Sequence, residues 1–176
     1  MANSKSLIAY FSRKGNNYVN GSIVNLPIGN TEVIAKKIQK LTGSDFLQIK
    51  TVKSYPDDYT ETTNVAQEEK RKNARPELVE KVNDMDSYDV IYIGYPNWWG
   101  TMPMAVFTFL EAYDFSGKNI APYCTHEGSG MGSSERDIKK VCPHSKVLPG
   151  LAITGGSVDR SDKDVENWLK KLDLMP

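Results

Sequence analysis

The sequence predicts one α/β domain built on a parallel five-stranded sheet with helices on both faces. Apolar runs rich in β-branched and aromatic residues recur along the 176 residues, as in strands that are buried on both faces. Amphipathic helical segments alternate with these runs, which is typical of βαβ units. No repeat, low-complexity tract or linker interrupts the alternation, so residues 1–176 are expected to form a single domain.

Composition and charge narrow the classes of function. Lys plus Arg and Asp plus Glu both number 22, so neither nucleic acid nor a basic protein partner is indicated by net charge. The first apolar run is too short for a signal peptide, and no segment is long enough to span a bilayer. Cys124 and Cys142 lack metal-ligand spacing and are expected to be reduced packing residues. We therefore expect a soluble cytoplasmic protein with no metal, nucleic-acid or membrane partner.

The first strand is predicted over residues 7–11, and the polar residues 12–17 follow it. Small and polar residues directly after a strand suit a phosphate-binding loop, because backbone amides must approach the anion closely. The expected helix is delayed by residues 18–28, in which Asn20-Gly21 is a strong two-residue hairpin turn. Residues 18–28 are therefore predicted to be a small β-ribbon inserted in the loop.

The first helix is predicted to begin at residues 29–32, with Asn30 or Thr31 as its N-cap, and to end at Gly43. A helix N-terminus that faces a strand end can bind an anion through its free amides and its dipole. The alternative is that Asn30 and Thr31 only cap the helix. The predicted buried stripe is Val33, Ile34, Ile38 and Leu41.

An edge strand is predicted over residues 46–51. It leads into residues 54–61, a polar loop with two tyrosines. Residues 64–83 are highly charged and weakly periodic, and are predicted to form two helical pieces divided by Pro76. The charges at 68–72 have mixed signs, which favours a solvated face over a binding patch.

Residues 89–103 contain a buried strand, an aromatic loop and the start of a helix. The strand is predicted to end at residues 94–96, because proline cannot donate to a sheet ladder. Trp98 and Trp99 then lie at the carboxyl end of the strand, where open α/β sheets bind ligands. Two adjacent side chains in this loop cannot easily both be buried, so a flat ligand is favoured over two core aromatics. Thr101 and Pro103 open the helix, which runs through Val106, Phe107 and Leu110.

A fourth strand is predicted over residues 120–124, although Pro122 is awkward inside a sheet. The loop 125–132 follows, and its three alternate glycines permit positive φ and close approach to a ligand. A flexible surface loop is the alternative. His126 is favoured as a structural hydrogen-bonding residue over a catalyst.

The remaining elements complete the alternation. A capping box at residues 134–137 is predicted to open a helix. Residues 146–148 and 151–153 form a final edge strand that is broken by a Pro-Gly pair. Residues 161–164 cap the last helix, whose inward side chains are Val165, Trp168, Leu169 and Leu172.

Three loops lie at the carboxyl ends of strands one, three and four. The first suits a phosphate, the second suits a flat ring, and the third permits close approach of the backbone to a ligand. With this strand count and loop placement the chain resembles the flavodoxin-like family of FMN proteins over nearly its whole length. Residues 98–103 and 125–130 look most like a bacterial branch of flavodoxins and NAD(P)H-dependent oxidoreductases. The resemblance implies a flavodoxin-like three-layer sandwich with sheet order 2-1-3-4-5, and FMN bound where strands one and three diverge.

The resemblance also implies the residues that contact FMN. Phosphate and ribityl binders would be Ser12, Arg13, Asn17, Asn30 and Thr31. The loop along the isoalloxazine, with one tryptophan stacked on it, would be Pro96, Asn97, Trp98, Trp99 and Gly100. The pyrimidine side would be enclosed by Thr125, His126, Glu127, Gly128, Ser129 and Gly130. The phosphate loop of ordinary flavodoxins is split here by residues 18–28, so its halves must meet in space, and the strong acidity of many flavodoxins is missing.

Three functions can be compared at this point. The first is a non-covalent FMN protein of the electron-carrier type, in which the flavin cycles between redox states and passes electrons between partner proteins. The alternative is an FMN-dependent NAD(P)H:quinone-type oxidoreductase that acts on a small acceptor. A sheet-edge binding module with a vestigial flavin site would leave the three loops unexplained. We expect the electron carrier, as a monomer or homodimer. We expect its cofactor to be FMN rather than FAD or NAD, because no G-x-G-x-x-G run occurs.

Overall fold

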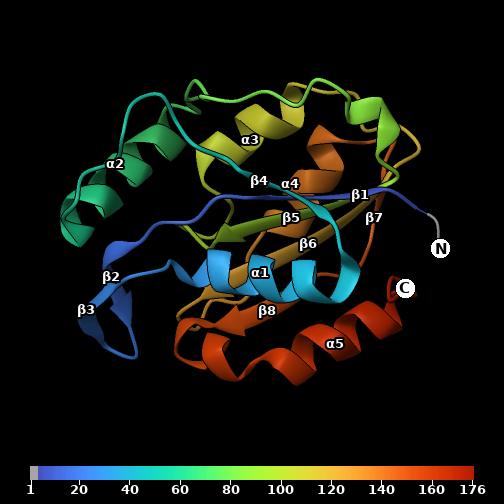
Figure 1. Cartoon of the computed structure of the whole chain (residues 1–176). Helices are drawn as coiled ribbons and strands as arrows, with labels where there is room; N and C mark the ends of the chain where they lie inside the picture. Colours follow the sequence, from blue (N-terminus) through green and yellow to red (C-terminus); the bar gives the residue numbers. More distant parts are fainter. Residues whose placement is uncertain (1–3) are drawn as a thin grey trace.

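The computed structural model describes residues 4–176, so the first three residues of the expected domain lie outside the described part. The chain forms a three-layer sandwich with a parallel sheet in the order β4-β1-β5-β6-β7, and β8 also pairs with β6 (Figure 1). Because β7 and β8 share one strand position, this order is the 2-1-3-4-5 order that the resemblance implies. The strands are β1 (Ser6–Tyr10), β4 (Asp45–Gln48), β5 (Val90–Pro96), β6 (Asn119–His126), β7 (Lys146–Val147) and β8 (Leu151–Thr154).

The helices cover both faces of the sheet, with α1 and α5 on one face and α2, α3 and α4 on the other (Figure 1). They are α1 (Asn30–Thr42), α2 (Tyr59–Arg71), α3 (Met104–Glu111), α4 (Ser134–Val141) and α5 (Asp162–Lys171), with 3-10 turns at Met85–Ser87 and Gly155–Arg160. Side chains that alternate along β5 divide between two cores: Tyr92 packs with Ile34 and Leu169, while Ile91 packs with Phe109 and Ile138. The central strand is therefore buried on both faces, as predicted. None of the helices within residues 4–176 has the length and apolarity needed to cross a bilayer.

The inserted ribbon is a hairpin of β2 (Gly15–Val19) and β3 (Ser22–Leu26), which pair antiparallel in a separate sheet. Asn20 and Gly21 form its turn with φ of 53° and 83°, the two positive angles that a type I′ turn requires. The hairpin lies at the end of the molecule where the parallel strands terminate (Figure 1). It begins at Gly15, three residues earlier than the expected range, so Asn16 and Asn17 belong to a strand rather than to the loop.

Pro122 is accommodated inside β6 because the neighbouring strand is interrupted at the same height. Strand β7 pairs with residues 119–120 and β8 pairs with residues 123–126. The amide of Leu148 donates to the carbonyl of Ile120 at 2.8 Å. Backbone groups two residues apart face the same side of a strand, so the imino nitrogen of Pro122 faces the break between β7 and β8.

The prediction of two helices in residues 64–83 is wrong for the second piece. Helix α2 begins earlier, at Tyr59, and residues 72–84 contain no helix. This segment instead runs antiparallel to the chain after β4, where the Val52 amide donates to Glu77 O and the Val79 amide donates to Lys50 O. Pro76 prevents continuation of the helix, and the sheet-like pairing satisfies the backbone that follows it.

Two predicted helix caps are also wrong. The N-cap of α1 is Gly29, so neither Asn30 nor Thr31 caps it. The N-cap position of α4 is Ser133 rather than Ser134, and no side chain makes a cap hydrogen bond there. Ser134 is fully buried and its hydroxyl donates to a carbonyl of the preceding turn, which removes it from the capping role.

Candidate functional site

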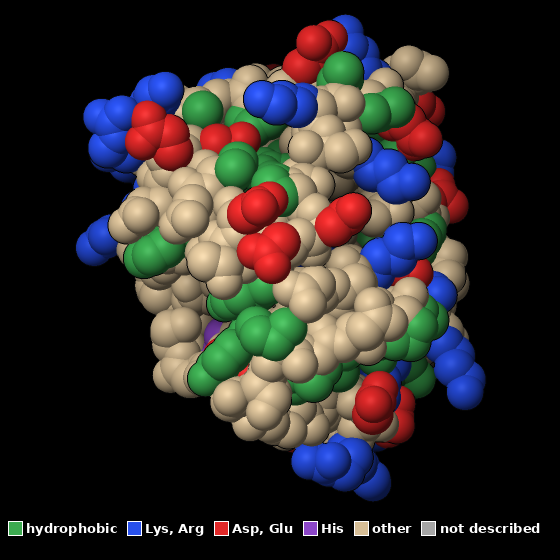
Figure 2. Space-filling view, turned by 90° about the vertical axis from the view of Figure 1, so that its left-hand side faces the viewer, with side chains coloured by type: hydrophobic (Ala, Val, Ile, Leu, Met, Phe, Trp, Pro, Cys, Tyr) green, Lys and Arg blue, Asp and Glu red, His purple; other side chains and the backbone are tan. Residues whose placement is uncertain are grey.

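A cavity of about 370 Å³ opens at the carboxyl ends of β1, β5 and β6. Every residue that the resemblance implied lines this cavity except Gly128 and Gly130, which lie in the same loop as lining residues. Tyr18, Leu26 and Tyr59 line it in addition. Figure 2 looks onto this end of the molecule, where hydrophobic side chains gather in the lower half of the face and acidic side chains lie above them.

The two halves of the split phosphate loop meet. The Glu32 amide, in the first turn of α1, donates to Ser12 Oγ at 3.1 Å. A Cβ on Gly29 would lie 2.2 Å from Ser12 Oγ and 2.8 Å from the carbonyl oxygen of Arg13, so only glycine permits this approach. Within residues 4–176 no acceptor takes the amides of Asn30 and Thr31. Free amides at a helix N-terminus can bind an anion.

The side chain of Thr31 makes a buried contact with the end of β6. Its Oγ1 is 2.9 Å from Oγ1 of Thr125, and the two residues are 2% and 5% exposed. This buried contact joins the first turn of α1 to the end of β6. The hydroxyl therefore connects two walls of the cavity, and the amide of Thr31 has no protein acceptor within residues 4–176.

Arg13 lines the cavity but its guanidinium is engaged by the protein. Nη1 donates to the carbonyl of Asn16 and to Oδ1 of Asn17, the latter at 3.4 Å. Nη2 donates to the carbonyls of Pro56 and Asp57 at 3.1 and 2.6 Å. Burial lowers the pKa of Arg13, and the charge of Asp57 opposes that shift. Arg13 therefore clamps the hairpin to the loop before α2, and its terminal N–H groups are not free for a phosphate.

Asn97 fixes the shape of the aromatic loop. Its Oδ1 accepts from the Gly100 amide at 2.9 Å, and its Nδ2 donates to Gly130 O at 2.8 Å. Its own amide donates to the Thr125 carbonyl at 2.8 Å. A Cβ on Gly132 would lie 2.1 Å from Gly100 O, which shows how closely the aromatic and glycine-rich loops approach.

Trp98 and Trp99 point in different directions. Trp98 packs edge-on against Phe11 and Tyr55, with ring centroids 5.0 and 5.2 Å apart. Trp99 is 46% exposed, and its Nε1 donates to the carbonyl of Thr63 in α2 at 3.0 Å. Its φ is 56° and that of Gly100 is 88°, so a tryptophan occupies a left-handed position that usually favours glycine or asparagine.

The glycine-rich loop presents His126 in one defined tautomer. The Gly128 amide donates to His126 Nδ1 at 2.9 Å, so the neutral ring carries its proton on Nε2. Burial lowers the pKa of His126, and the charge of Glu127 opposes the shift. Oε1 of Glu127 accepts from the Asn20 amide at 2.8 Å, which docks the hairpin turn on this loop. Because Nδ1 is occupied, Nε2–H is the group that His126 can offer to a ligand.

Sequence reasoning missed Tyr18 and Tyr59, which stack with ring centroids 5.9 Å apart. Tyr59 is the first residue of α2, and Asp58 caps that helix by accepting from the Glu61 amide. The sequence Asp58-Tyr59-Thr60-Glu61 has the spacing of a capping box, so it could have indicated this helix start. Nothing comparable in the sequence indicates that Tyr18 would stack on it.

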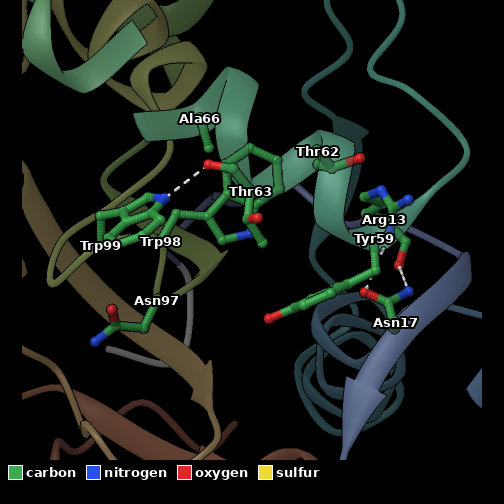
Figure 3. Close-up of a pocket in the computed structure, with 9 residues that line it drawn as sticks. All are labelled: Arg13, Asn17, Tyr59, Thr62, Thr63, Ala66, Asn97, Trp98 and Trp99. Atoms are coloured by element: carbon green, nitrogen blue, oxygen red, sulfur yellow. Dashed lines mark hydrogen bonds between the residues drawn. The ribbon is translucent and has the colours of Figure 1, made fainter. Parts of the chain in front are cut away.

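A second compartment of about 420 Å³ adjoins the first, between α2 and the aromatic loop. Thr62, Thr63 and Ala66 line it from α2, opposite Trp98 and Trp99 (Figure 3). We call it the α2 slot.

Comparison with known proteins identifies close similarity to one family. A family model described as Flavodoxin matches residues 5–172. A provisionally assigned flavoprotein from Bacteroides eggerthii DSM 20697 is 28% identical, with a TM-score of 0.79 over 97% of this chain and 99% of that one. A flavoprotein in complex with FMN from Lactobacillus acidophilus NCFM is 23% identical, with a TM-score of 0.67 over 94% and 98%. The FMN-bound flavodoxin of Fusobacterium nucleatum is 13% identical, with a TM-score of 0.56 over 97% of each chain. Among curated proteins, none matches the chain significantly.

Proposed function

The chain belongs to the flavodoxin family, and we propose that it binds FMN non-covalently and uses it to pass electrons between partners. The observation that carries this proposal is that free amides of α1, the aromatic loop and the glycine-rich loop line one cavity. The FMN-bound proteins from Lactobacillus acidophilus and Fusobacterium nucleatum share the fold, which supports the same cofactor here.

The residues present fit FMN. One end of the cavity offers the unpaired amides of Asn30 and Thr31 at the positive end of α1, which suits a phosphate. The other end offers the exposed ring of Trp99 and the Nε2–H of His126, which suits a flat ring with polar edges. A volume of about 370 Å³ lies within the usual range of ligand sites.

Bound FMN would supply the redox chemistry, and the chain would hold and shield it. The amides of Asn30 and Thr31 and the Ser12 hydroxyl would bind the phosphate. Trp99 would cover the isoalloxazine ring. The hydrogen bond from Asn97 Nδ2 to Gly130 O would keep the aromatic and glycine-rich loops at a fixed separation. The hairpin, docked through Asn20 on Glu127, would reduce access of water to the middle of the site.

Mass spectrometry of the cofactor released from purified protein tests the proposal. We expect FMN as the main species, since the amides of Asn30 and Thr31 form one anion site, which suits the single phosphate of FMN. Protein that is colourless after saturation with FMN, or that retains FAD instead, would contradict it. Quenching of flavin fluorescence on binding is the second expected signature, because Trp99 presents a free face.

An FMN-dependent NAD(P)H:quinone-type oxidoreductase is the second candidate function. The observation that favours it is the α2 slot, which gives a small molecule room next to the flavin cavity. Protein partners would instead approach the open side of the flavin cavity, where Tyr18 of the hairpin is 41% exposed and Trp99 is 46% exposed. Apolar exposure of this kind beside a cofactor is common at docking sites.

A further inference from the structure

The α2 slot is built by one face of a helix and one aromatic turn. Tyr59, Thr62, Thr63 and Ala66 have the i, i+3, i+4, i+7 spacing that places them on one side of α2. Trp98 and Trp99 form the opposite wall, and the ring of Tyr59 projects into the space between the tryptophans and the Arg13 side (Figure 3). Tyr59, Asn97, Trp98 and Trp99 line both compartments, whereas Thr62, Thr63 and Ala66 line the slot alone. Neither the start of α1 nor the loop 125–129 lines the slot, so the groups suited to FMN phosphate belong to the other compartment.

The walls of the slot are held at a fixed separation. Nε1 of Trp99 donates to Thr63 O at 3.0 Å, and Nζ of Lys70 donates to the carbonyl of Trp99. Both contacts connect the aromatic loop to α2, one through the indole of Trp99 and the other through its backbone carbonyl. A pocket with walls fixed in advance loses less free energy on binding, so the slot is preorganised for a flat occupant.

The charged and amide groups around the slot are already engaged. Arg13 is the one charged side chain among its lining residues in the described chain, and both of its terminal nitrogens donate to protein oxygens. The side-chain amide of Asn97 is hydrogen-bonded through both its nitrogen and its oxygen. The Thr62 hydroxyl donates to the carbonyls of Pro56 and Asp58 at 2.8 Å. A phosphate or carboxylate in the slot would therefore find no free cation.

Two donors remain for a ligand. Within residues 4–176, neither the Tyr59 hydroxyl nor Nε1 of Trp98 has a protein hydrogen-bond partner. Burial and the charge of Glu127 raise the pKa of Tyr59, which keeps its hydroxyl protonated at neutral pH. The complementary ligand is flat, uncharged and carries acceptor oxygens at its edge.

We propose that the α2 slot binds a quinone-type ring, uncharged and with carbonyl oxygens at its edge, that accepts hydrogen bonds from Tyr59 and Trp98. The inference rests on the proposed function, because such a ring is an electron acceptor here only when FMN occupies the adjoining cavity. Pyridine dinucleotides fit the slot less well, since Arg13, the one charged side chain among its described lining residues, already donates to protein oxygens.

The test is equilibrium binding of 2,3-dimethyl-1,4-naphthoquinone, which cannot alkylate cysteine, to the oxidised FMN-loaded protein by saturation-transfer NMR and calorimetry. We expect saturable binding that is not displaced by NADH. Ala66→Leu should fill the slot and weaken quinone binding at least tenfold, with the FMN dissociation constant unchanged within twofold. Tyr59→Phe, which keeps the ring, should weaken quinone binding about threefold to tenfold. Gln67→Leu, on the exposed side of the same helix, is the matched control and should bind as the unsubstituted protein does.

Three results would overturn the inference while the proposed function stands. They are absence of saturable quinone binding to protein that retains FMN, an equal loss in Gln67→Leu, and a loss of FMN rather than quinone affinity in Ala66→Leu. The last result would mean that the flavin ring itself occupies the slot. Should Ala66→Leu not fold, Tyr59→Phe alone decides, and unchanged quinone affinity in that variant counts against the inference. Failure of the proposed function has its own signature, a protein that does not retain FMN.

Discussion

Trp98 and Trp99 are neighbours in the chain but contribute differently to stability. Trp98 is packed between Phe11 and Tyr55, so Trp98→Leu should lower the free energy of unfolding by about 2–4 kcal/mol. Trp99 is half exposed and held at a φ of 56°, which costs a non-glycine residue roughly 1–2 kcal/mol. Trp99→Asn should therefore leave the stability of the FMN-free protein unchanged or raise it by up to about 1 kcal/mol.

Urea unfolding of both variants without FMN measures this difference in stability. Titration with FMN measures the effect of each substitution on FMN affinity. Trp99→Asn should bind FMN more weakly by about 1–3 kcal/mol, because the ring that we propose to cover the flavin is lost. If Trp99→Asn destabilises the protein as much as Trp98→Leu does, the strained turn is a structural requirement and not a feature kept for the ligand.

His126 should make stability depend on pH. Its pKa is lowered by burial in the folded protein, so between that value and the unfolded value of about 6.5 the unfolded chain binds more protons. The free energy of unfolding therefore falls as pH decreases below about 6.5. His126→Asn keeps an acceptor for the Gly128 amide and should lose less stability between pH 7.5 and 5.5 than the parent protein.

Urea unfolding of the parent protein and of His126→Asn at the two pH values checks this prediction. Identical pH responses in His126→Asn and the parent would show that His126 does not titrate within this range.

At the scale of elements, the proposed anion site depends on the contact between the first loop and α1. Gly29→Ala would drive a Cβ into Ser12 Oγ and the Arg13 carbonyl, so the loop must move away from the helix. We expect a loss of about 1–3 kcal/mol in stability, as for other overpacked sites, and at least a tenfold loss in FMN affinity. Gly43→Ala, at the other end of α1, is the control.

That control strains a left-handed cap with φ of 69° and nothing within 4 Å, so it should lower stability by about 1 kcal/mol and leave FMN affinity unchanged. Thermal unfolding and fluorescence titration of the two variants separate stability from binding. Equal FMN affinity in Gly29→Ala and the parent would mean that the start of α1 is not the phosphate site.

Element types could be predicted where hydrophobic periodicity was strong, and boundaries failed where tertiary contacts competed. The buried strand β5 and the helices α1 and α5 follow from their apolar patterns. Residues 72–84 were predicted as helix from charge and weak periodicity, but pairing with the chain after β4 satisfies their backbone instead. The expected caps at Asn30 and Ser134 failed because Gly29 makes room for Ser12 and because Ser134 is buried in the core.

At the scale of the whole molecule, the three loops converge because parallel strands end at one edge of the sheet. Strand topology indicated the loops, and the family resemblance indicated most of the residues that line the cavity. The roles of individual side chains could not be obtained this way. The engagement of Arg13 by Pro56 and Asp57, and the pairing of Thr31 with Thr125, depend on contacts between segments 43 and 94 residues apart. The α2 slot was not predicted, because its lining combines one helix face with a distant turn.

The electron donor depends on the surroundings of the whole cavity. A preference for NADPH over NADH needs a group that binds the additional phosphate, and Arg13, the one guanidinium at the cavity within residues 4–176, is engaged by backbone carbonyls. We therefore expect anaerobic NADH or NADPH alone to bleach the FMN-loaded protein slowly and without preference, and a separate flavodoxin reductase to bleach it rapidly. Stopped-flow absorbance measures both rates, with Arg13→Lys as the companion variant, which should lose stability rather than gain NADPH selectivity. Rapid bleaching by NADPH alone, with turnover on a quinone, would replace the carrier by the oxidoreductase.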